Sequence, residues 1–381
     1  MNENTALRML SAVMEWDLNK SQEEHQWLRL ISAVKYDGYR DFQAGMRFLE
    51  SLVGWLLQFE SKDRPAAYEF VRNRLVFIST VERERLVEIM YPQTVLPRLL
   101  KNVAMTRGIA PWQVYTDPKA KHQLDVARQR TLFLGLSDGA RLDSFRHVNV
   151  GRISNEQVVV GTQLDAEKWQ DLRKELQKSL VKLNSEQEPT FDTIYLVDDF
   201  AGSGTSFIRT EEEEGKSVWK GKLLRFLRSL GRANDELKLN FQSKDWTLVI
   251  HHLIVTDMAV EHLKKALSLV KEEMKDLYPW FANFEVTWSY RLPSNFPLTP
   301  EADPDFFALT GKYYDPRIET DATRKGGVEH LGMGYAGCAL PLVLDHNTPN
   351  NTVALVWAES DDEAGPHEMH PLFYRRQRHT K

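Results

Sequence analysis

The stretch Ile194–Ser206, which reads IYLVDDFAGSGTS, is the part of this chain that decides its fold. Apolar residues lead into Asp198 and Asp199, and a loop of small and hydroxylated residues follows at once. This order is typical of a buried parallel strand that delivers a ligand site at its carboxyl end. Carboxylates accept hydrogen bonds from sugar hydroxyls, and a glycine-containing turn presents backbone N–H groups to an anion. The stretch therefore predicts a site for a pair of sugar hydroxyls joined to a phosphate.

Strand and helix patterns alternate on both sides of this stretch, between about residues 130 and 290. The predicted strands are Thr131–Leu136, Val158–Val160, Thr193–Val197, Thr247–Val255 and Phe284–Tyr290. Leucine-rich stripes predict helices over Asp165–Leu183, over Ser217–Leu230 with Gly231 as its C-cap, and through Val260–Val270. This alternation predicts an α/β fold, a mainly parallel, Rossmann-like sheet flanked by helices.

The rest of the chain divides into a helical and an irregular part. We predict an all-helical N-terminal domain over residues 1–125, with winged-helix content as a second interpretation, and an α/β domain over residues 126–381. In its irregular C-terminal part, Cys338–Leu344 and Thr352–Trp357 resemble two strands around a turn with the sequence HNTPNN. The asparagines of that turn could read a nucleobase edge, but turn formation is the favoured interpretation.

Composition limits the class of protein. The 381 residues suggest two or three domains, and the net charge of -5 gives no global argument for binding nucleic acid or a membrane. Cys338 is the single cysteine, so no internal disulfide can form and a reducing cytoplasm fits best. We see neither a secretory signal nor an apolar run of membrane-spanning length, and expect a cytoplasmic protein that does not enter the membrane.

The stretch around the two aspartates resembles the PRPP-binding signature of the type I phosphoribosyltransferases, and this resemblance implies their fold. It implies that Asp198 and Asp199 hold the ribose hydroxyls, with Mg²⁺ bound by these two acids directly or through water and bridging to pyrophosphate. It also implies a grip on the 5′-phosphate by a loop of six residues, Ala201, Gly202, Ser203, Gly204, Thr205 and Ser206. In that family a base displaces pyrophosphate at C1′ of the ribose.

The pyrophosphate side of such a site needs a second loop, for which SDGAR is the best candidate. Ser137, Asp138 and Gly139 follow the first predicted strand of the sheet, and Arg141 offers a two-pronged donor to phosphate oxygens. A second interpretation stays open, in which Ser137 or Asp138 caps a helix and Arg141 lies on the surface.

A narrower resemblance links the chain to the phosphoribosyltransferase-like proteins predicted from bacterial conflict and defence loci. It rests on LSDGAR (136–141), VDDFAGSGTS (197–206), HNTPNNT and HPLFYRR, and would span about residues 130–375. It implies a role in antiphage defence beside a partner such as the reverse transcriptase of a retron. The stretch FIRTEEEEGK (207–216) departs from the family pattern, because a helix is expected directly after the phosphate loop. A solvated loop is the favoured interpretation of it, with a lid or a partner-binding insertion as alternatives.

Two hypotheses for function follow. The first is an enzyme that binds PRPP or a nucleotide with Mg²⁺ and acts at C1′, either as a glycosyltransferase or by cleaving the glycosidic bond of a nucleotide. The second is a catalytically inactive module that senses a nucleotide or serves as a scaffold for a partner protein or nucleic-acid complex. The basic C-terminal residues 374–381 could contact nucleic acid, although a terminal charge run is more often only solvated.

Overall fold

The computed structural model describes residues 1–42, 45–281, 283–328, 330–360 and 367–375. Contacts divide the chain into two compact units. We call Glu84–Leu292 the sheet unit, and Met1–Arg83 together with Pro293–Lys381 the helical unit. The domain boundary expected at residues 125/126 is not one of these divisions, which fall at 83/84 and 292/293. Of the basic C-terminal residues, 376–381 lie outside the described residues.

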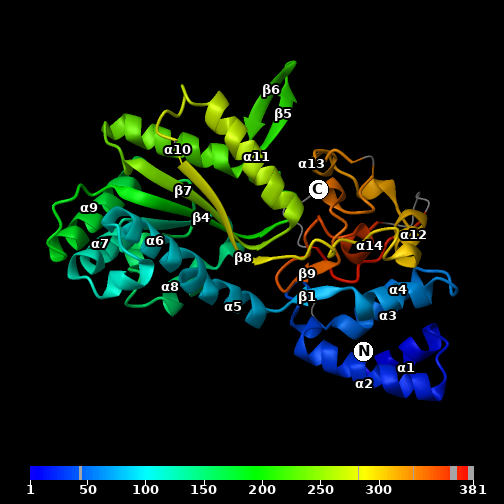
Figure 1. The fold of residues 1–381 in the computed structure, drawn as a ribbon. Coiled ribbons are helices and arrows are strands. Elements are labelled where there is room, and N and C mark those ends of the chain that lie inside the picture. Colours follow the sequence, from blue (N-terminus) through cyan, green and yellow to red (C-terminus); the bar gives the residue numbers. More distant parts are fainter. Residues whose placement is uncertain (43–44, 282, 329, 361–366, 376–381) are drawn as a thin grey trace. The chain divides into compact units, whose positions relative to one another are not determined.

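The sheet unit is built on five parallel strands, as the alternation of strands and helices predicts (Figure 1). Their order is β3-β2-β4-β7-β8. The strands are β2 (Thr131–Gly135), β3 (Val158–Val159), β4 (Phe191–Ala201), β7 (Gln242–Val255) and β8 (Asn283–Arg291). The long apolar runs of β4 and β7 fit central strands, which parallel sheets bury on both faces.

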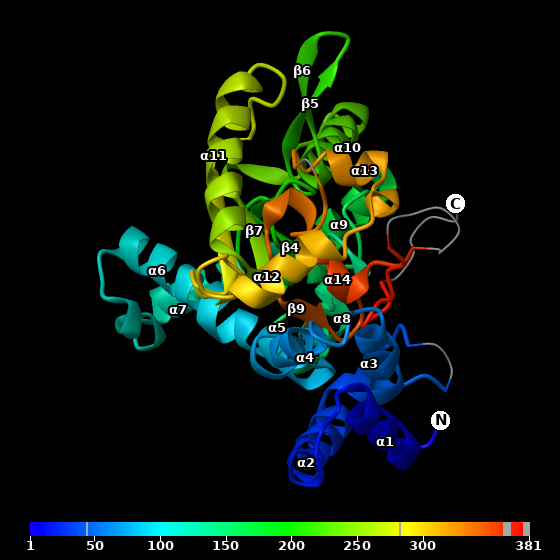
Figure 2. The same ribbon diagram turned by 90° about the vertical axis from the view of Figure 1, so that its right-hand side faces the viewer.

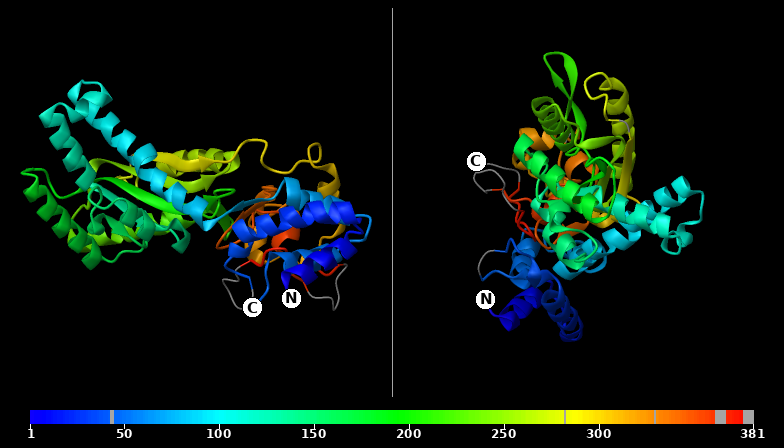
Figure 3. Two further views of the ribbon diagram at one scale, coloured as in Figure 1. Left: turned by 90° about the horizontal axis from the view of Figure 1, so that it is seen from below. Right: turned by 90° about the vertical axis from the view of Figure 1, so that its left-hand side faces the viewer.

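Helices cover both faces of this sheet. One face carries α9 (Ala166–Lys182), α10 (Lys222–Leu237) and α11 (Asp257–Glu273), whose leucine stripes share one core with residues such as Ile194 and Leu248. The opposite face carries α8 (Leu142–Val148), where Phe145 contacts Phe133, and α6 (Leu96–Arg107), where Arg98 donates to Thr193 Oγ1 at 2.9 Å. In Figure 3, α6 (cyan) leads away from the strands and projects to one side of the sheet together with the helix that follows it. The remaining helix of this unit is α7 (Pro118–Gln129).

Helix α5 (Thr80–Met90) is followed directly by a π-helical turn, Tyr91–Val95, and then by α6. Pro92 and Pro97 lie near the starts of the π-helical turn and of α6 and do not interrupt this helical run. The change from α-helical to π-helical turns lies where Pro92 lacks a backbone N–H.

The region after the phosphate loop differs from the prediction. Residues 217–220 belong not to a helix but to β6 (Lys216–Lys220), which pairs antiparallel with β5 (Arg209–Glu213). Figures 1 and 2 show this hairpin extending away from the five-stranded sheet. The helix begins at Lys222 and passes through Gly231, where a side chain would meet only ordinary packing distances, so Gly231 is not its C-cap. The leucine stripe predicts the helix correctly, but the charged residues of the hairpin give no strand pattern, although their pairing partners are close in sequence.

The helical unit joins the two ends of the chain in one core. It contains α1 (Glu3–Val13), α2 (Leu18–Val34), α3 (Phe48–Leu57), α4 (Arg64–Asn73), α12 (Pro304–Lys312), α13 (Asp321–Arg324) and α14 (Ala354–Trp357). A two-stranded parallel sheet links β1 (Val76–Ile78) to β9 (Leu342–Leu344). The first strand predicted near the C-terminus is therefore only three residues long, and the second, Thr352–Trp357, is wrong because Ala354–Trp357 forms α14. Trp55 Nε1 donates to Leu355 O at 2.6 Å, which fixes this helix in the core.

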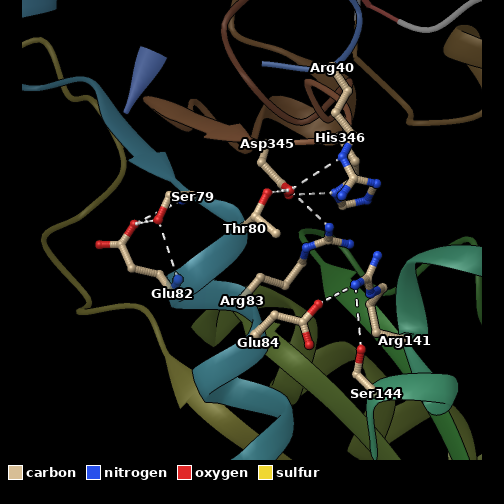
Figure 4. A network of polar contacts seen from close by, with 10 residues as sticks. All are labelled: Arg40, Ser79, Thr80, Glu82, Arg83, Glu84, Arg141, Ser144, Asp345 and His346. Atoms are coloured by element: carbon tan, nitrogen blue, oxygen red, sulfur yellow. Dashed lines mark hydrogen bonds and ion pairs between the residues drawn. The ribbon is translucent and has the colours of Figure 1, made fainter. Parts of the chain in front are cut away.

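A buried ionic cluster holds the loop after β9 within the helical unit (Figure 4). Asp345 accepts hydrogen bonds from Thr80 Oγ1 at 2.5 Å, from Arg83 Nη2 at 2.9 Å and from His346 Nδ1 at 3.1 Å. Burial alone would raise the pKa of Asp345, but these donors outweigh it and lower the pKa to about 2. The carboxylate is therefore charged at neutral pH and ties the start of α5 to the loop after β9.

None of the helices among the described residues is both long enough and apolar enough to span a membrane.

Candidate functional site

The two aspartates lie inside β4, which continues to Ala201 rather than ending before them. Asp198 stands opposite His252 of β7 in the parallel register. Successive side chains of a strand point to opposite faces, so Asp198 faces the α10 side of the sheet and Asp199 the other side. The pair therefore presents carboxylates in two directions at the carboxyl end of the sheet.

Asp198 is held by partners from two other segments. Its side chain is buried, Ser137 Oγ donates to Oδ1, and the ammonium of Lys222 pairs with Oδ2. Burial raises the pKa of Asp198 above its ordinary value, the Lys222 charge opposes this, and the neighbouring Asp199 adds to it. Both oxygens of Asp198 thus have protein partners.

Asp199 lies against the SDGAR loop. A Cβ atom at Gly139 would stand 2.3 Å from Asp199 Oδ2, far inside any real contact. Only glycine allows this approach, so Gly139 is needed for packing rather than for an unusual backbone angle. Together with the bond from Ser137 to Asp198, this contact brings the two predicted motifs to one place at the ends of β2 and β4.

The predicted phosphate loop is fixed on its other side by α11. Thr256 accepts a hydrogen bond from the amide of Ala259 at 3.0 Å, which caps α11, and donates its own hydroxyl proton to Gly202 O. Gly204 has φ +77° and lies so close to α11 that a Cβ atom would be 3.3 Å from Ala259 O. Inside the loop, the hydroxyls of Ser203 and Thr205 are 2.9 Å apart.

The backbone of this loop has unused donors. Within the described part of the chain, four of its amide N–H groups reach no acceptor, those of Gly202, Ser203, Gly204 and Ser206. Gly202 and Ser203 are buried. Buried backbone donors nearly always have a partner, and successive amides in a turn form an anion-binding nest. The loop therefore has the chemistry of an anion site.

The hairpin β5–β6 is an insertion that leaves the start of α10 beside this loop. The amide of Lys222 donates to Ser206 O at 3.3 Å, and that of Leu223 donates to Phe207 O at 3.1 Å. Gly221, at φ +120°, lets the chain pass Phe207 O, which a Cβ atom would approach to 2.3 Å. The helix expected after the loop is thus present, because the chain leaves at Arg209 and returns at Lys220.

The acidic run in the hairpin is partly neutralised by its own strands. Arg209 pairs with Glu211 at 2.5 Å, and Lys220 pairs with Glu213 at 2.6 Å. Glu211–Glu214 is therefore part of a regular hairpin rather than an irregular solvated loop, which corrects the favoured interpretation from sequence.

A cavity of about 320 Å³ opens on the β2 side of Asp198. Ser137 and Lys222, the two partners of Asp198, both line it. The other lining residues come from the ends of β2 and β3 and from α10: Gly135, Leu136, Asp138, Val160, Gly161, Thr162, Gln163 and Arg225. Ligands of open α/β sheets bind at this end of the strands.

Arg141 is engaged elsewhere in the sheet unit (Figure 4). Its Nη2 pairs with Glu84 and lies 3.4 Å from Ser144 Oγ, while its backbone is left-handed with φ 51° at the start of α8. Neither Ser137 nor Asp138 caps α8 with its side chain. The second interpretation of SDGAR, as a helix-capping motif, is therefore wrong. A phosphate contact by Arg141 would require the ion pair with Glu84 to open.

Three residues of the site were missed by sequence analysis. Lys222 and His252 fall within a predicted helix and a predicted strand, Thr256 directly follows that strand, and no motif singles any of them out as a site residue. His252 is fully buried, burial lowers its pKa to about 3, and its Nδ1 has no hydrogen-bond partner among the described residues. The available signal for Thr256 was its position before a helix; nothing local marks Lys222 as a partner of Asp198.

The other polar residues considered from sequence have structural roles. His251 contacts Thr287 Oγ1 at 3.0 Å and Ser289 Oγ at 3.2 Å, both of the neighbouring strand β8, so its role is internal hydrogen bonding. In the helical unit, Asn351 Nδ2 donates to Tyr335 O at 3.2 Å and contacts the buried Cys338 Sγ at 3.2 Å.

Comparison with known protein families matches residues 52–375 to the family described as PRTase-CE. No curated protein and no solved structure matches the chain. The match begins within α3, so most of the helices before residue 130 lie inside the family's extent rather than in an extension to it. Since it covers well over half of the chain, the protein belongs to the PRTase-CE family and is phosphoribosyltransferase-like.

Proposed function

We propose that the sheet unit binds PRPP or a related ribose 5-phosphate compound and acts at C1′ of its ribose. The observation that carries this proposal is the loop at residues 202–206, whose four amides find no acceptor in the described protein and which adjoins two carboxylates. An anion nest next to hydroxyl acceptors matches the two ends of a ribose 5-phosphate.

In this proposal the two aspartates have different roles. Asp199 accepts hydrogen bonds from the ribose hydroxyls, whereas Asp198 positions Ser137 and Lys222 through its two oxygens. The Lys222 ammonium, on the wall of the cavity, faces negative charge on the leaving pyrophosphate. The C1′–O bond breaks with its electron pair on pyrophosphate, and an acceptor attacks C1′.

Mg²⁺ fits this site only if the phosphates of the ligand supply part of its coordination. Asp198 already has Lys222 on one oxygen and Ser137 on the other, and the described residues contain no cluster of three His, Cys, Asp or Glu side chains suited to a metal. Mg²⁺ commonly binds one or two carboxylates plus substrate phosphates, and Asp199 is the carboxylate that would meet it. When bound, the ion would neutralise charge on the pyrophosphate.

A second candidate function is nucleotide sensing without turnover. It is favoured by the engagement of Arg141 with Glu84 and of both Asp198 oxygens with protein groups, which leaves fewer side chains for a reaction. In that case the sheet unit binds the nucleotide and signals to a partner or serves as a scaffold. By resemblance of its motifs, we further propose that the protein acts in bacterial antiphage defence, beside a reverse transcriptase or another defence component.

Calorimetric titration with PRPP, with and without Mg²⁺, tests the site, and release of pyrophosphate in the same mixture tests turnover. The expected result is binding that Asp199→Asn weakens at least tenfold. The matched control is Asp276→Asn, which removes the same charge from an exposed position of the sheet unit. Binding without pyrophosphate release would favour the sensor, and equal binding by both variants would refute the site.

A further inference from the structure

An arginine-lined groove continues from the candidate site along α10. A second cavity, of about 450 Å³, shares Gln163 and Arg225 with the cavity beside Asp198. Its wall includes Arg228 and Arg232 of the same helix. The opposite wall is the segment before and at the start of α9, which Ser229 holds by donating to Leu164 O at 2.9 Å.

The positions of these arginines follow from the helix geometry. Residues 225, 228 and 232 are spaced three and four apart, so their side chains share one face of α10. The face opposite them carries the buried leucines Leu223, Leu224, Leu227 and Leu230. With Lys222 the cationic face, which we call the α10 basic face, extends over eleven residues, whose first and last Cα atoms are about 15 Å apart at 1.5 Å per residue.

The arginines of this face have no partners within the described protein. Arg225, Arg228 and Arg232 are exposed, and none makes a side-chain hydrogen bond or ion pair with another described residue. Most other arginines of the sheet unit do make ion pairs, namely Arg85, Arg98, Arg107, Arg128, Arg130, Arg141, Arg209 and Arg291. Unpaired guanidinium groups along a groove are suited to phosphate, which they bind through two parallel donors.

The groove also contains two acids, which limit the length of its cationic part. Asp165 accepts a hydrogen bond from the amide of Lys168 at 2.8 Å and so caps α9. Glu236 lies one turn beyond Arg232, at the far end of the face. Asp165 lies in the wall opposite Ser229, and the positive charge of α10 runs from Lys222, next to the predicted ribose site, to Arg232.

We propose that the α10 basic face binds the phosphodiester backbone of a single-stranded nucleic acid whose ribose end reaches the candidate site. A length of about 15 Å exceeds a single pyrophosphate and accommodates several phosphates of a strand, which rise about 3.4 Å each in a duplex. The lining residues include no aromatic side chain, so the arginines would hold the strand through its phosphates, which carry no sequence information, and not through stacked bases. Only one part of this inference, the placement of the ribose end of the strand in the candidate site, rests on the proposed function.

The test measures anisotropy of a fluorescein-labelled 12-nucleotide thymidine strand mixed with the full-length protein at several salt concentrations. The changed protein is Arg225→Gln/Arg228→Gln/Arg232→Gln. Each phosphate contact in a single strand contributes about 0.7 to the slope of log affinity against log salt, so this slope should fall by about 2. The matched control, Lys264→Gln/Lys265→Gln/Lys271→Gln, removes three exposed charges from α11 and should leave the slope unchanged.

The same proteins are titrated with PRPP, so that this proposal and the proposed function can fail separately. We expect Arg228→Gln/Arg232→Gln, added for this titration because Arg225 also lines the cavity beside Asp198, to bind PRPP as the unchanged protein does, and Asp199→Asn to keep the salt slope. Equal loss of strand affinity in both triple variants, or no binding of the strand at low salt, would overturn the nucleic-acid proposal whatever the PRPP result.

Discussion

Replacing Lys222 by methionine tests how the candidate site is held together. Asp198 is 4% exposed and pairs with Lys222, so the substitution leaves a buried carboxylate without its counter-charge. Removing one partner of a buried pair typically costs about 3–5 kcal/mol. The Lys222 side chain is 22% exposed, which places the expected loss in stability of the sheet unit near the lower end, at about 3 kcal/mol.

The loss should depend on pH in a defined direction. The pKa of Asp198 is already raised, so between its ordinary value of 3.8 and the raised value the folded state binds more protons than the unfolded state. Stability contributed by this group therefore falls as pH rises through that window. Lys222→Met raises the pKa further and extends the window upward, so the difference between the two proteins grows from pH 5 to pH 7.5.

Urea unfolding at both pH values is the assay, read by hydrogen exchange of peptides from β4 and β7 so that only the sheet unit is measured. The double variant Asp198→Asn/Lys222→Met should recover most of the loss, because it removes the charge as well as its partner. Lys264→Met on the exposed face of α11 is the matched control. An unchanged midpoint for Lys222→Met at pH 7.5, or no recovery in the double variant, would refute the role assigned to this ion pair.

Three further predictions concern other parts of the molecule. Asp345→Asn should destabilise the helical unit by about 2 kcal/mol at pH 7, because the pKa of Asp345 is lowered to about 2 in the folded state. The difference in stability between the two proteins should vanish as the pH falls from about 4 toward 2, which urea unfolding followed by hydrogen exchange of β9 peptides measures. Gly139→Ala should cost about 1–3 kcal/mol and weaken PRPP binding in calorimetry, because its Cβ would displace Asp199, whereas Gly54→Ala, with nothing within 4 Å, should leave binding unchanged. Replacing residues 210–219 by Asn-Gly should keep PRPP affinity, since the hairpin enters and leaves at one point; lost affinity in the same titration would show that the hairpin contacts the ligand.

The parallel sheet could be predicted because its signals are local. Apolar runs such as TLVIHHLIV and the leucine stripes of α9 and α11 indicate which residues are buried. The alternation of strands and helices along the chain permits few topologies. The helix α14 could not be predicted, because packing against distant residues overrides a short and ambiguous pattern. Leu355 illustrates this, since its carbonyl is held by Trp55, three hundred positions earlier. The hairpin β5–β6 was missed for a different reason: its pairing is local, within residues 209–220, but its strands are rich in charged residues and lack an apolar strand pattern.

The sequence by itself determined the fold class, the location of the acidic pair at the carboxyl end of a strand, and the nearby phosphate-type loop. These follow from residue type and order within thirteen positions. Only the tertiary structure decided that Asp198 is paired with Lys222 and Ser137, that Asp199 lies against Gly139, and that three arginines of α10 line a groove beside them. Each of these contacts joins residues that are far apart in the chain or share a helix face, and their chemistry depends on burial and distance, which a linear pattern does not contain.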